Sequence, residues 1–227
     1  MIMREKTLFT WSGGKDSALA LSELLRGEKY DIVALVTTIT ADYDRVSMHG
    51  VRRVLLEEQA ASLGLPLDEV FLSKDTSMEN YELKMRQMLE KYLDAGVSTV
   101  AFGDIFLEDV RKYREDNLLK IGMKTVFPLW KKDTRVLAHS FIKSGFKAIV
   151  TCVDSTVLDK TFVGKKFDTR FLSRLPSSVD PCGENGEFHS FVFDGPIFRT
   201  PIRFTKGEIV LRDNRFYYCD LLPVGSH

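Results

Sequence analysis

In the first half of the chain, short β-branched runs alternate with longer stretches of helical apolar spacing. Strands are predicted over 7–10, 31–40, 68–72 and 97–104, and helices over 16–25, 51–64 and 78–94. The second of these helices is expected to stop at Gly64, with Pro66 just beyond it. Strand and helix in regular alternation predict an α/β fold, with a Rossmann-like parallel sheet, right-handed crossovers and helices on both faces.

The pattern changes after Lys124. A helix is predicted near 134–143 and an apolar strand over 147–153, followed by a stretch rich in Phe, Asp, Gly and Pro over 167–201. The segment 205–222 alternates like an antiparallel hairpin with Asp-Asn at its turn. We therefore expect two domains, 1–125 and a smaller α+β domain over 126–227.

Composition narrows the range of partners. The 227 residues are 44% hydrophobic, enough for a full core, and 32 basic residues balance 32 acidic ones. No global charge attracts nucleic acid, and no apolar stretch approaches the ~18 residues that span a bilayer. We expect a cytoplasmic protein with no membrane partner and no nucleic-acid partner, and leave open a homo-oligomer. The three cysteines lack metal or disulfide spacing and are expected to be small buried residues.

The segment SGGKDS (12–17) lies between a predicted strand and a predicted helix. In that context a glycine-rich turn directs backbone N–H groups and the positive end of a helix at phosphate. It does not fit the GxxxxGK[ST] pattern, so its geometry must differ from the usual γ-phosphate loop. Ordinary caps and turn residues would explain any two of the six positions, but six specified positions recur by chance only about once in 10⁷ windows.

SGGKDS resembles the PP-loop of the ATP pyrophosphatases, which cleave ATP between its α and β phosphates. Together with GDIFLEDVRKYRE (103–115) and DPCGENGEFHSFVFDGP (180–196), it makes the whole chain similar to the diphthine–ammonia ligase family. The resemblance implies an adenine nucleotide alpha-hydrolase-like fold with ATP and Mg²⁺ as cofactors. It implies that the pyrophosphate end of ATP is held by Ser12, Gly13, Gly14, Lys15, Asp16 and Ser17. Thr37 and Gly103 are further nucleotide-binding candidates.

Several candidate roles have plainer alternatives. Asp16 is the candidate Mg²⁺ contact, or else an ordinary acidic residue in the first turn of a helix. Asp104 is a candidate catalytic carboxylate at a strand end, or else a turn residue. Glu108, Arg111 and Glu115 share a helical face and are candidates for substrate binding, or else surface ion pairs.

The segment DPCGENGEFHS has too few apolar residues for a core element, and its glycines and asparagine indicate a shaped loop. We expect it to bind the acceptor or ammonia across the crevice from SGGKDS, unless it is only a polar connector. The candidates are Gly183, Glu184, Asn185, Glu187 and His189, of which Glu184 and Glu187 are also catalytic candidates, alongside Lys15, Asp16 and Asp104.

Two further segments bear on the nucleotide. The backbone of 36–39 is the expected platform for the adenine, although Thr37 and Thr38 also fit as ordinary strand residues. The polar segment ADYDRVSMHG (41–50) is expected to be a mobile lid or an acceptor-binding loop, with His49 as its titrating group.

The resemblance implies an amide-forming ligase: a substrate carboxylate attacks the α-phosphorus, pyrophosphate leaves, and ammonia displaces AMP. No glutaminase is visible, so free ammonia or a separate donor protein is implied. The family's acceptor is a modified histidine of a translation elongation factor, and in a bacterial protein a small carboxylic acid would replace it. The alternatives are a tRNA-modifying PP-loop enzyme and a non-catalytic nucleotide-binding module.

Overall fold

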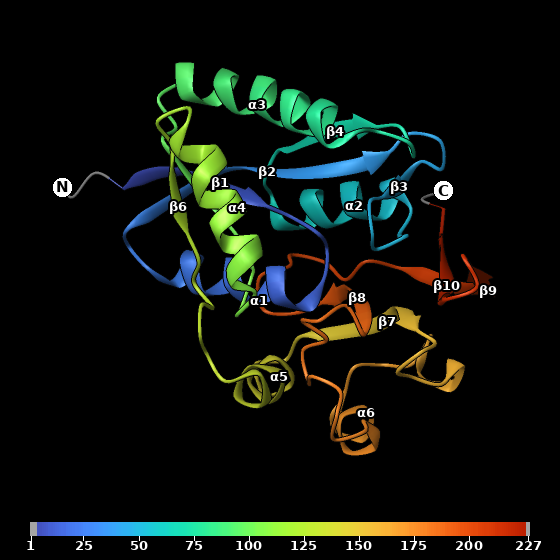
Figure 1. Ribbon diagram of the computed structural model, residues 1–227. Coiled ribbons are helices and arrows are strands. Elements are labelled where there is room, and N and C mark those ends of the chain that lie inside the picture. Colours follow the sequence, from blue (N-terminus) through green and yellow to red (C-terminus); the bar gives the residue numbers. More distant parts are fainter. Residues whose placement is uncertain (1–3, 226–227) are drawn as a thin grey trace.

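The protein contains two β-sheets with helices between and around them (Figure 1). A computed structural model describes residues 4–225. The first sheet consists of β1 (Glu5–Thr10), β2 (Tyr30–Thr40), β3 (Arg45–Val46), β4 (Leu67–Leu72), β5 (Thr99–Ala101) and β6 (Lys124–Val126). Five of these strands run parallel in the order β4-β2-β1-β5-β6, and β3 pairs antiparallel with the end of β2. The parallel α/β fold predicted for this half is confirmed.

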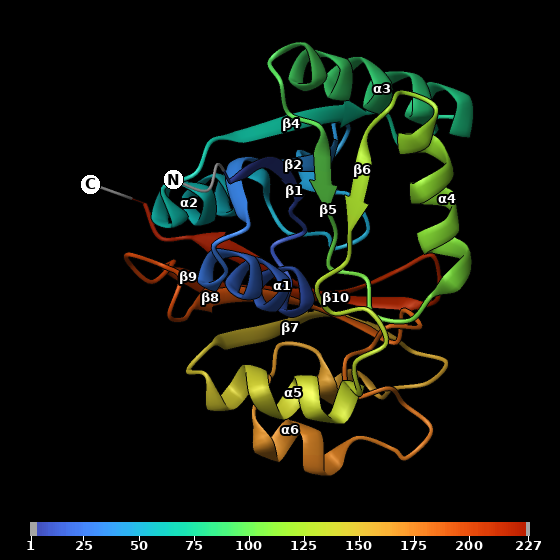
Figure 2. The same cartoon turned by 90° about the vertical axis from the view of Figure 1, so that its left-hand side faces the viewer.

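Four helices cover this sheet, two on each face. They are α1 (Lys15–Arg26), α2 (Arg53–Leu63), α3 (Met78–Asp94) and α4 (Glu108–Leu119). Figure 2 shows α3 and α4 on the outer face and α1 and α2 on the face toward the second sheet. Gly64 ends α2 with a φ of 71°, in the left-handed region that favours glycine, as the sequence predicted.

The second sheet is antiparallel, in the order β8-β7-β10-β9. Its elements are α5 (Thr134–Lys143), β7 (Lys147–Asp154), the short 3₁₀ helix η1 (Lys160–Phe162), α6 (Thr169–Arg174), β8 (Phe188–Asp194), β9 (Phe204–Arg212) and β10 (Phe216–Pro223). Asp213 and Asn214, with φ of 51° and 49°, make the predicted turn between β9 and β10. All three cysteines are buried, as expected, and free.

One apolar core joins the two sheets. It extends from Leu21 of α1 and Leu56 of α2 to Phe141 of α5 and Phe191 of β8. A smaller core lies beneath α3 and α4 on the other face of the first sheet. The division of the chain at residue 125 stays a prediction, and the shared core means that the two parts bury each other's apolar surface.

The segment 41–50, predicted as a mobile lid or an acceptor-binding loop, contains a short strand. Arg45 and Val46 form β3, and the backbone N–H of Ser47 donates to Thr38 O at 3.0 Å. The expectation of a plain loop was wrong at these positions, because a two-residue strand is too short to show any alternation in the sequence. No helix within residues 4–225 has the length and apolar character needed to cross a membrane.

Candidate functional site

A cavity of about 440 Å³ opens where β1, β2 and β5 end, facing β8 of the second sheet. Its wall is made by five segments far apart in the chain: 10–17, 36–49, 81–85, 103–114 and 182–190. The convergence of SGGKDS, the loop after β2 and the GDIF segment, predicted from the parallel topology, is confirmed. The DPCGENGEFHS loop also lies on this cavity, across from α1.

The SGGKDS turn presents a helix N-terminus to the cavity. Gly13 has a φ of 76°, and Gly14 is the N-cap of α1 without any side-chain cap, which leaves N–H groups of the first turn to a ligand. The hydroxyl of Ser17 donates to Gly14 O at 2.9 Å, and Ser12 Oγ lies 3.1 Å from Ser17 Oγ. The two serines therefore shape the turn from inside.

Glycine at 103 is required by close packing. A Cβ there would lie 3.1 Å from both the N and the Cα of Ser17. Any side chain at this position would push the end of β5 away from α1, so Gly103 lets the two elements approach. Thr37 is buried in the wall of the cavity, near the predicted adenine platform.

Lys15 is buried at the junction of the two halves. Its ammonium lies 2.8 Å from Asp16 Oδ2, donates to the carbonyl oxygen of Cys182, and sits 5.0 Å from the centre of the Phe188 ring. Burial lowers the pKa of Lys15, but the negative charge of Asp16 and its neighbours outweighs burial and raises it. Lys15 is therefore a fixed cation beside the phosphate-binding turn.

The turn is held from behind by the second sheet. The backbone N–H of Lys15 donates to Ser190 Oγ at 3.2 Å, and that of Val192 donates to Gly13 O at 2.9 Å. Gln59, fully buried in α2, donates its amide to Gly13 O at 3.1 Å and to Val192 O at 2.6 Å. Its oxygen accepts from Trp11 Nε1 at 2.8 Å.

Glu184 bridges the two halves. Its carboxylate accepts from the backbone N–H of Ile105 at 2.7 Å, directly after the Gly103-Asp104 pair. Burial raises the pKa of Glu184 to about 7, although the hydrogen bond from Ile105 acts in the opposite direction. Glu184 and Gly183 line the cavity, as the sequence analysis placed them.

Glu187 does not reach the cavity, which corrects the expectation of a direct catalytic or substrate contact. Its carboxylate accepts from the backbone N–H groups of Asp180 and Asn185 and from the Asn185 amide, each at 3.0 Å. A carboxylate held by three donors within its own loop shapes that loop. Asn185 is likewise occupied there and lies outside the cavity wall.

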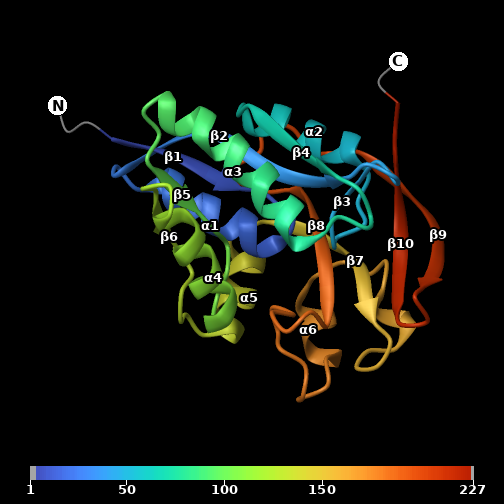
Figure 3. The same ribbon diagram turned by 45° about the horizontal axis from the view of Figure 1, so that its top comes forward.

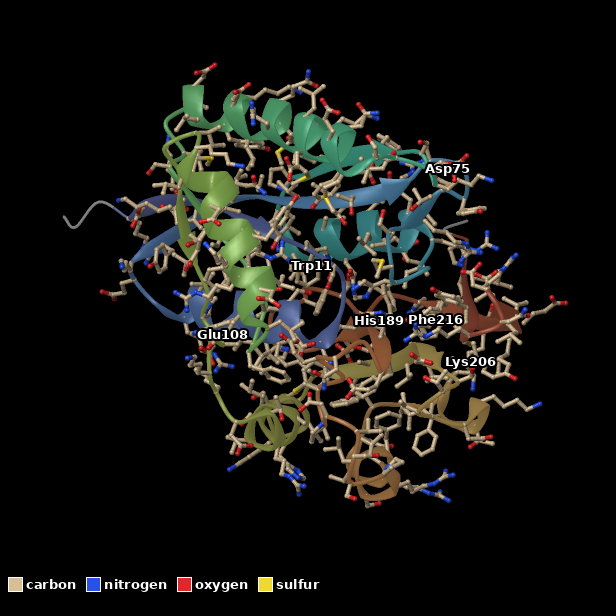
Figure 4. The ribbon with its side chains drawn as sticks, viewed as in Figure 1. Trp11, Asp75, Glu108, His189, Lys206 and Phe216 are labelled. Atoms are coloured by element: carbon tan, nitrogen blue, oxygen red, sulfur yellow. The ribbon has the colours of Figure 1, made fainter. Side chains whose placement is uncertain are left out.

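The three charged residues of α4 that were predicted to bind substrate form ion pairs outside the cavity instead. Glu108 pairs with Lys131 at 3.1 Å, and Arg111 pairs with Glu115 at 2.7 Å while stacking over Trp130. None of these three predicted substrate contacts lines the cavity, and Figure 4 shows Glu108 well apart from His189. The plainer reading, surface ion pairs, is the one the geometry supports.

The face of α4 that meets the cavity carries Val110 and Arg114, just after Leu107 at the N-cap. The Arg114 guanidinium lies 2.9 and 3.1 Å from the two carboxylate oxygens of Asp104. Arg114 was not predicted, because 107, 110 and 114 have the same helical spacing as 108, 111 and 115, and spacing alone does not tell which face meets the cavity. Gln59 and Ser190 carried no such signal.

Two histidines complete the wall. The rings of His49 and His189 lie 4.6 Å apart, at an interplanar angle of 41°. Burial lowers the pKa of His189 to about 4 and that of His49 well below its usual value, and the charge of Lys15 adds to both shifts. Both rings are therefore neutral at pH 7.

No group of three or more His, Cys, Asp or Glu side chains within residues 4–225 is arranged to hold a metal ion. Asp16 is the carboxylate of the phosphate-binding turn, and its side chain is 26% exposed. Mg²⁺ commonly takes one or two protein carboxylates together with substrate phosphates, which Asp16 fits.

The sequence of this chain is similar to those of known proteins. The family models described as the diphthamide synthase N-terminal and C-terminal domains match residues 5–125 and 133–221. A diphthine--ammonia ligase from Schizosaccharomyces pombe is 28% identical over 228 residues, which cover 90% of this chain and 37% of that protein. The chain thus spans little more than a third of that relative.

Shorter relatives are covered almost completely. The diphthine--ammonia ligase of Danio rerio is 27% identical over 94% of this chain and 90% of its own length, and that of Homo sapiens is 26% identical over 88% and 83%. A solved U34-tRNA thiolase from Methanococcus maripaludis aligns with 61% of this chain and 56% of its own, at 18% identity and a TM-score of 0.37. With both of its domain models matched along the chain, the protein belongs to the diphthamide synthase family.

Proposed function

We propose that this protein is an ATP-dependent, amide-forming ligase that adenylates a carboxylate, releases pyrophosphate and transfers ammonia to the acyl group. The observation that carries the proposal is the shared cavity: the SGGKDS turn and the 182–190 loop face each other across it. Curated relatives named diphthine--ammonia ligase support the reaction type. ATP and ammonia follow as substrates, and the cytoplasm, where ATP is abundant, as the compartment.

The first half of the chain would bind ATP. The N–H groups at the start of α1 and the Lys15 ammonium neutralise the pyrophosphate as it leaves, where preorganised positive charge lowers the barrier most. Asp16 would hold a Mg²⁺ ion together with the phosphates, and the ion would supply further charge neutralisation. Thr37 lines the cavity and would lie against the nucleoside.

The second half would receive the acceptor. Glu184 lines the cavity and accepts a hydrogen bond from the backbone N–H of Ile105. Its position in the cavity therefore depends on how the two halves are placed. With its pKa near 7, the Glu184 carboxylate can take a proton from the attacking ammonia nitrogen at slightly alkaline pH. The acceptor is a protein-borne diphthine, as the relatives' names suggest, or a small carboxylic acid.

The test is a product analysis. The protein is incubated with MgATP, ammonium chloride and either a diphthine-bearing elongation factor or a panel of small carboxylic acids, and the nucleotides are separated by ion-exchange chromatography. We expect AMP and pyrophosphate in equal amounts, dependent on one acceptor and on ammonium. ADP and phosphate as the sole products would contradict the proposal.

A further inference from the structure

His49 and His189 come from segments far apart in the chain and meet beside the phosphate-binding turn. Figure 4 shows His189 at the junction of the two halves. The His49 ring packs on the turn itself, since a Cβ on Gly14 would lie 3.3 Å from His49 Cε1. His49 Nδ1 is buried and has no hydrogen-bond partner among the described residues. A buried polar atom without a partner is available to bind a ligand that enters the cavity.

The protein fixes His49 firmly in this place. Met48 and Gly50 on either side of it have φ of 67° and 68°, so the chain turns sharply to present the ring. Gly50 lies against the Tyr218 ring, where a Cβ would be only 2.7 Å away. Asp220 of β10 accepts from Arg52 at 2.7 Å and from Arg45 at 2.9 Å, and Figure 3 shows the β9–β10 hairpin beside β3. Backbone and ion pairs together hold the ring.

The charge around the two rings favours an anion. Lys15 faces both from α1, and the N-terminus of the same helix opens toward the cavity. The negative groups on the other walls are already engaged: Asp16 by Lys15, Asp104 by Arg114, and Glu184 by backbone N–H groups. An ammonium ion would be repelled by Lys15, whereas a polyphosphate would be attracted by Lys15 and by the N-terminus of α1.

We propose that His49 and His189 bind the polyphosphate of the nucleotide, and that the pair takes up protons from solution when the polyphosphate enters. The inference rests on the proposed function, because it takes ATP as the ligand. The N–H of the neutral His49 ring is directed at the backbone carbonyl of Ser190, so its buried Nδ1 becomes a donor only when the ring is protonated. Several negative charges beside the rings then stabilise the imidazolium form, so each ring gains a second donor and a positive charge.

Calorimetry tests the proposal directly. MgATP, and separately magnesium pyrophosphate, is titrated into the full chain at pH 6.5 in two buffers of different ionisation enthalpy, which gives the number of protons taken up. For the wild type we expect net uptake that declines toward pH 8. His49→Phe should weaken ATP binding about 10- to 100-fold, as expected for losing a hydrogen bond to a charged group.

A second variant separates binding from titration. The double variant His49→Asn, His189→Asn keeps amide N–H donors but cannot titrate, so it should bind ATP better than His49→Phe while losing the proton uptake. His139→Phe, at an exposed position on α5, is the matched control and should behave as wild type. Circular dichroism shows whether each variant is folded.

The outcomes are distinguishable. ATP bound by the wild type without proton uptake, uptake unchanged in the double variant, or His49→Phe binding within twofold of wild type would each overturn the histidine role and leave the proposed ligase standing. Absence of any ATP binding by the folded wild type would overturn both.

Discussion

At the scale of single residues, Glu184 links protonation to both stability and reaction. Burial raises its pKa from 4.5 to about 7, so the folded chain holds this proton more tightly than the unfolded chain. The contribution of Glu184 to stability is therefore greatest below pH 4.5 and falls as the pH rises toward 7. Glu184→Gln has no carboxyl group to ionise, so it does not lose stability in this way. We therefore expect its unfolding free energy, measured in urea, to change less than that of the wild type between pH 5 and pH 8.

The same substitution bears on the reaction. Wild-type AMP formation should rise with pH through an inflection near 7, and Glu184→Gln should lack that inflection. Glu108→Gln, on the exposed start of α4, is the control and should keep the wild-type profile. An inflection near 7 that survives in Glu184→Gln would assign it to another group.

Lys15 carries the second prediction at this scale. Lys15→Met removes the cation beside the phosphate-binding turn and should lower kcat for pyrophosphate release about 10²- to 10³-fold, the size of effect seen when one oxyanion-stabilising donor is removed. Lys29→Met, at an exposed position, should leave kcat unchanged. An unchanged kcat in Lys15→Met would contradict its role at the leaving group.

At the scale of elements, α4 separates a cavity face from a solvent face. Arg114→Met leaves Asp104 unpaired in the cavity wall, and we expect a fall in kcat/KM for ATP of about tenfold or more, because an uncompensated carboxylate repels phosphate. Arg111→Met loses contacts with Glu115, Trp130 and Phe127, all outside the cavity wall, and should stay within twofold of wild type. Equal losses in the two variants, measured by steady-state kinetics, would contradict this division.

At the scale of the whole molecule, Gln59 joins the first sheet, the phosphate-binding turn and β8. Gln59→Leu would leave Trp11 Nε1, Gly13 O and Val192 O without this partner, and should lower the unfolding free energy by about 2–4 kcal/mol. Since the halves share one core, circular dichroism and tryptophan fluorescence should report a single unfolding transition.

Gln87→Leu, on the exposed face of α3, is the matched control for this substitution and should change stability by less than about 0.5 kcal/mol. Two separate unfolding transitions in the wild type would show that the halves fold independently. If the two glutamine substitutions lower the unfolding free energy equally, the buried Gln59 amide does not stabilise the contact between the two halves.

The sequence by itself determined the features that arise from local physics. Apolar periodicity placed α3 over Met78–Asp94 and α5 over Thr134–Lys143, and strand-helix alternation determined the parallel sheet and hence the edge at which SGGKDS lies. Glycine spacing indicated the shape of the turn, because only glycine adopts its backbone geometry without strain.

Only the tertiary structure decided which side chains face the cavity. Glu184 and Glu187 were both candidates from the sequence, and Arg111 was a candidate while Arg114 was not, but packing turned Glu187 into its own loop and Arg111 onto an aromatic ring. The pairing of His49 with His189 and the position of Gln59 depend on contacts between segments that no local pattern links. The direction of a side chain is set by what packs against it, and those neighbours come from distant parts of the chain.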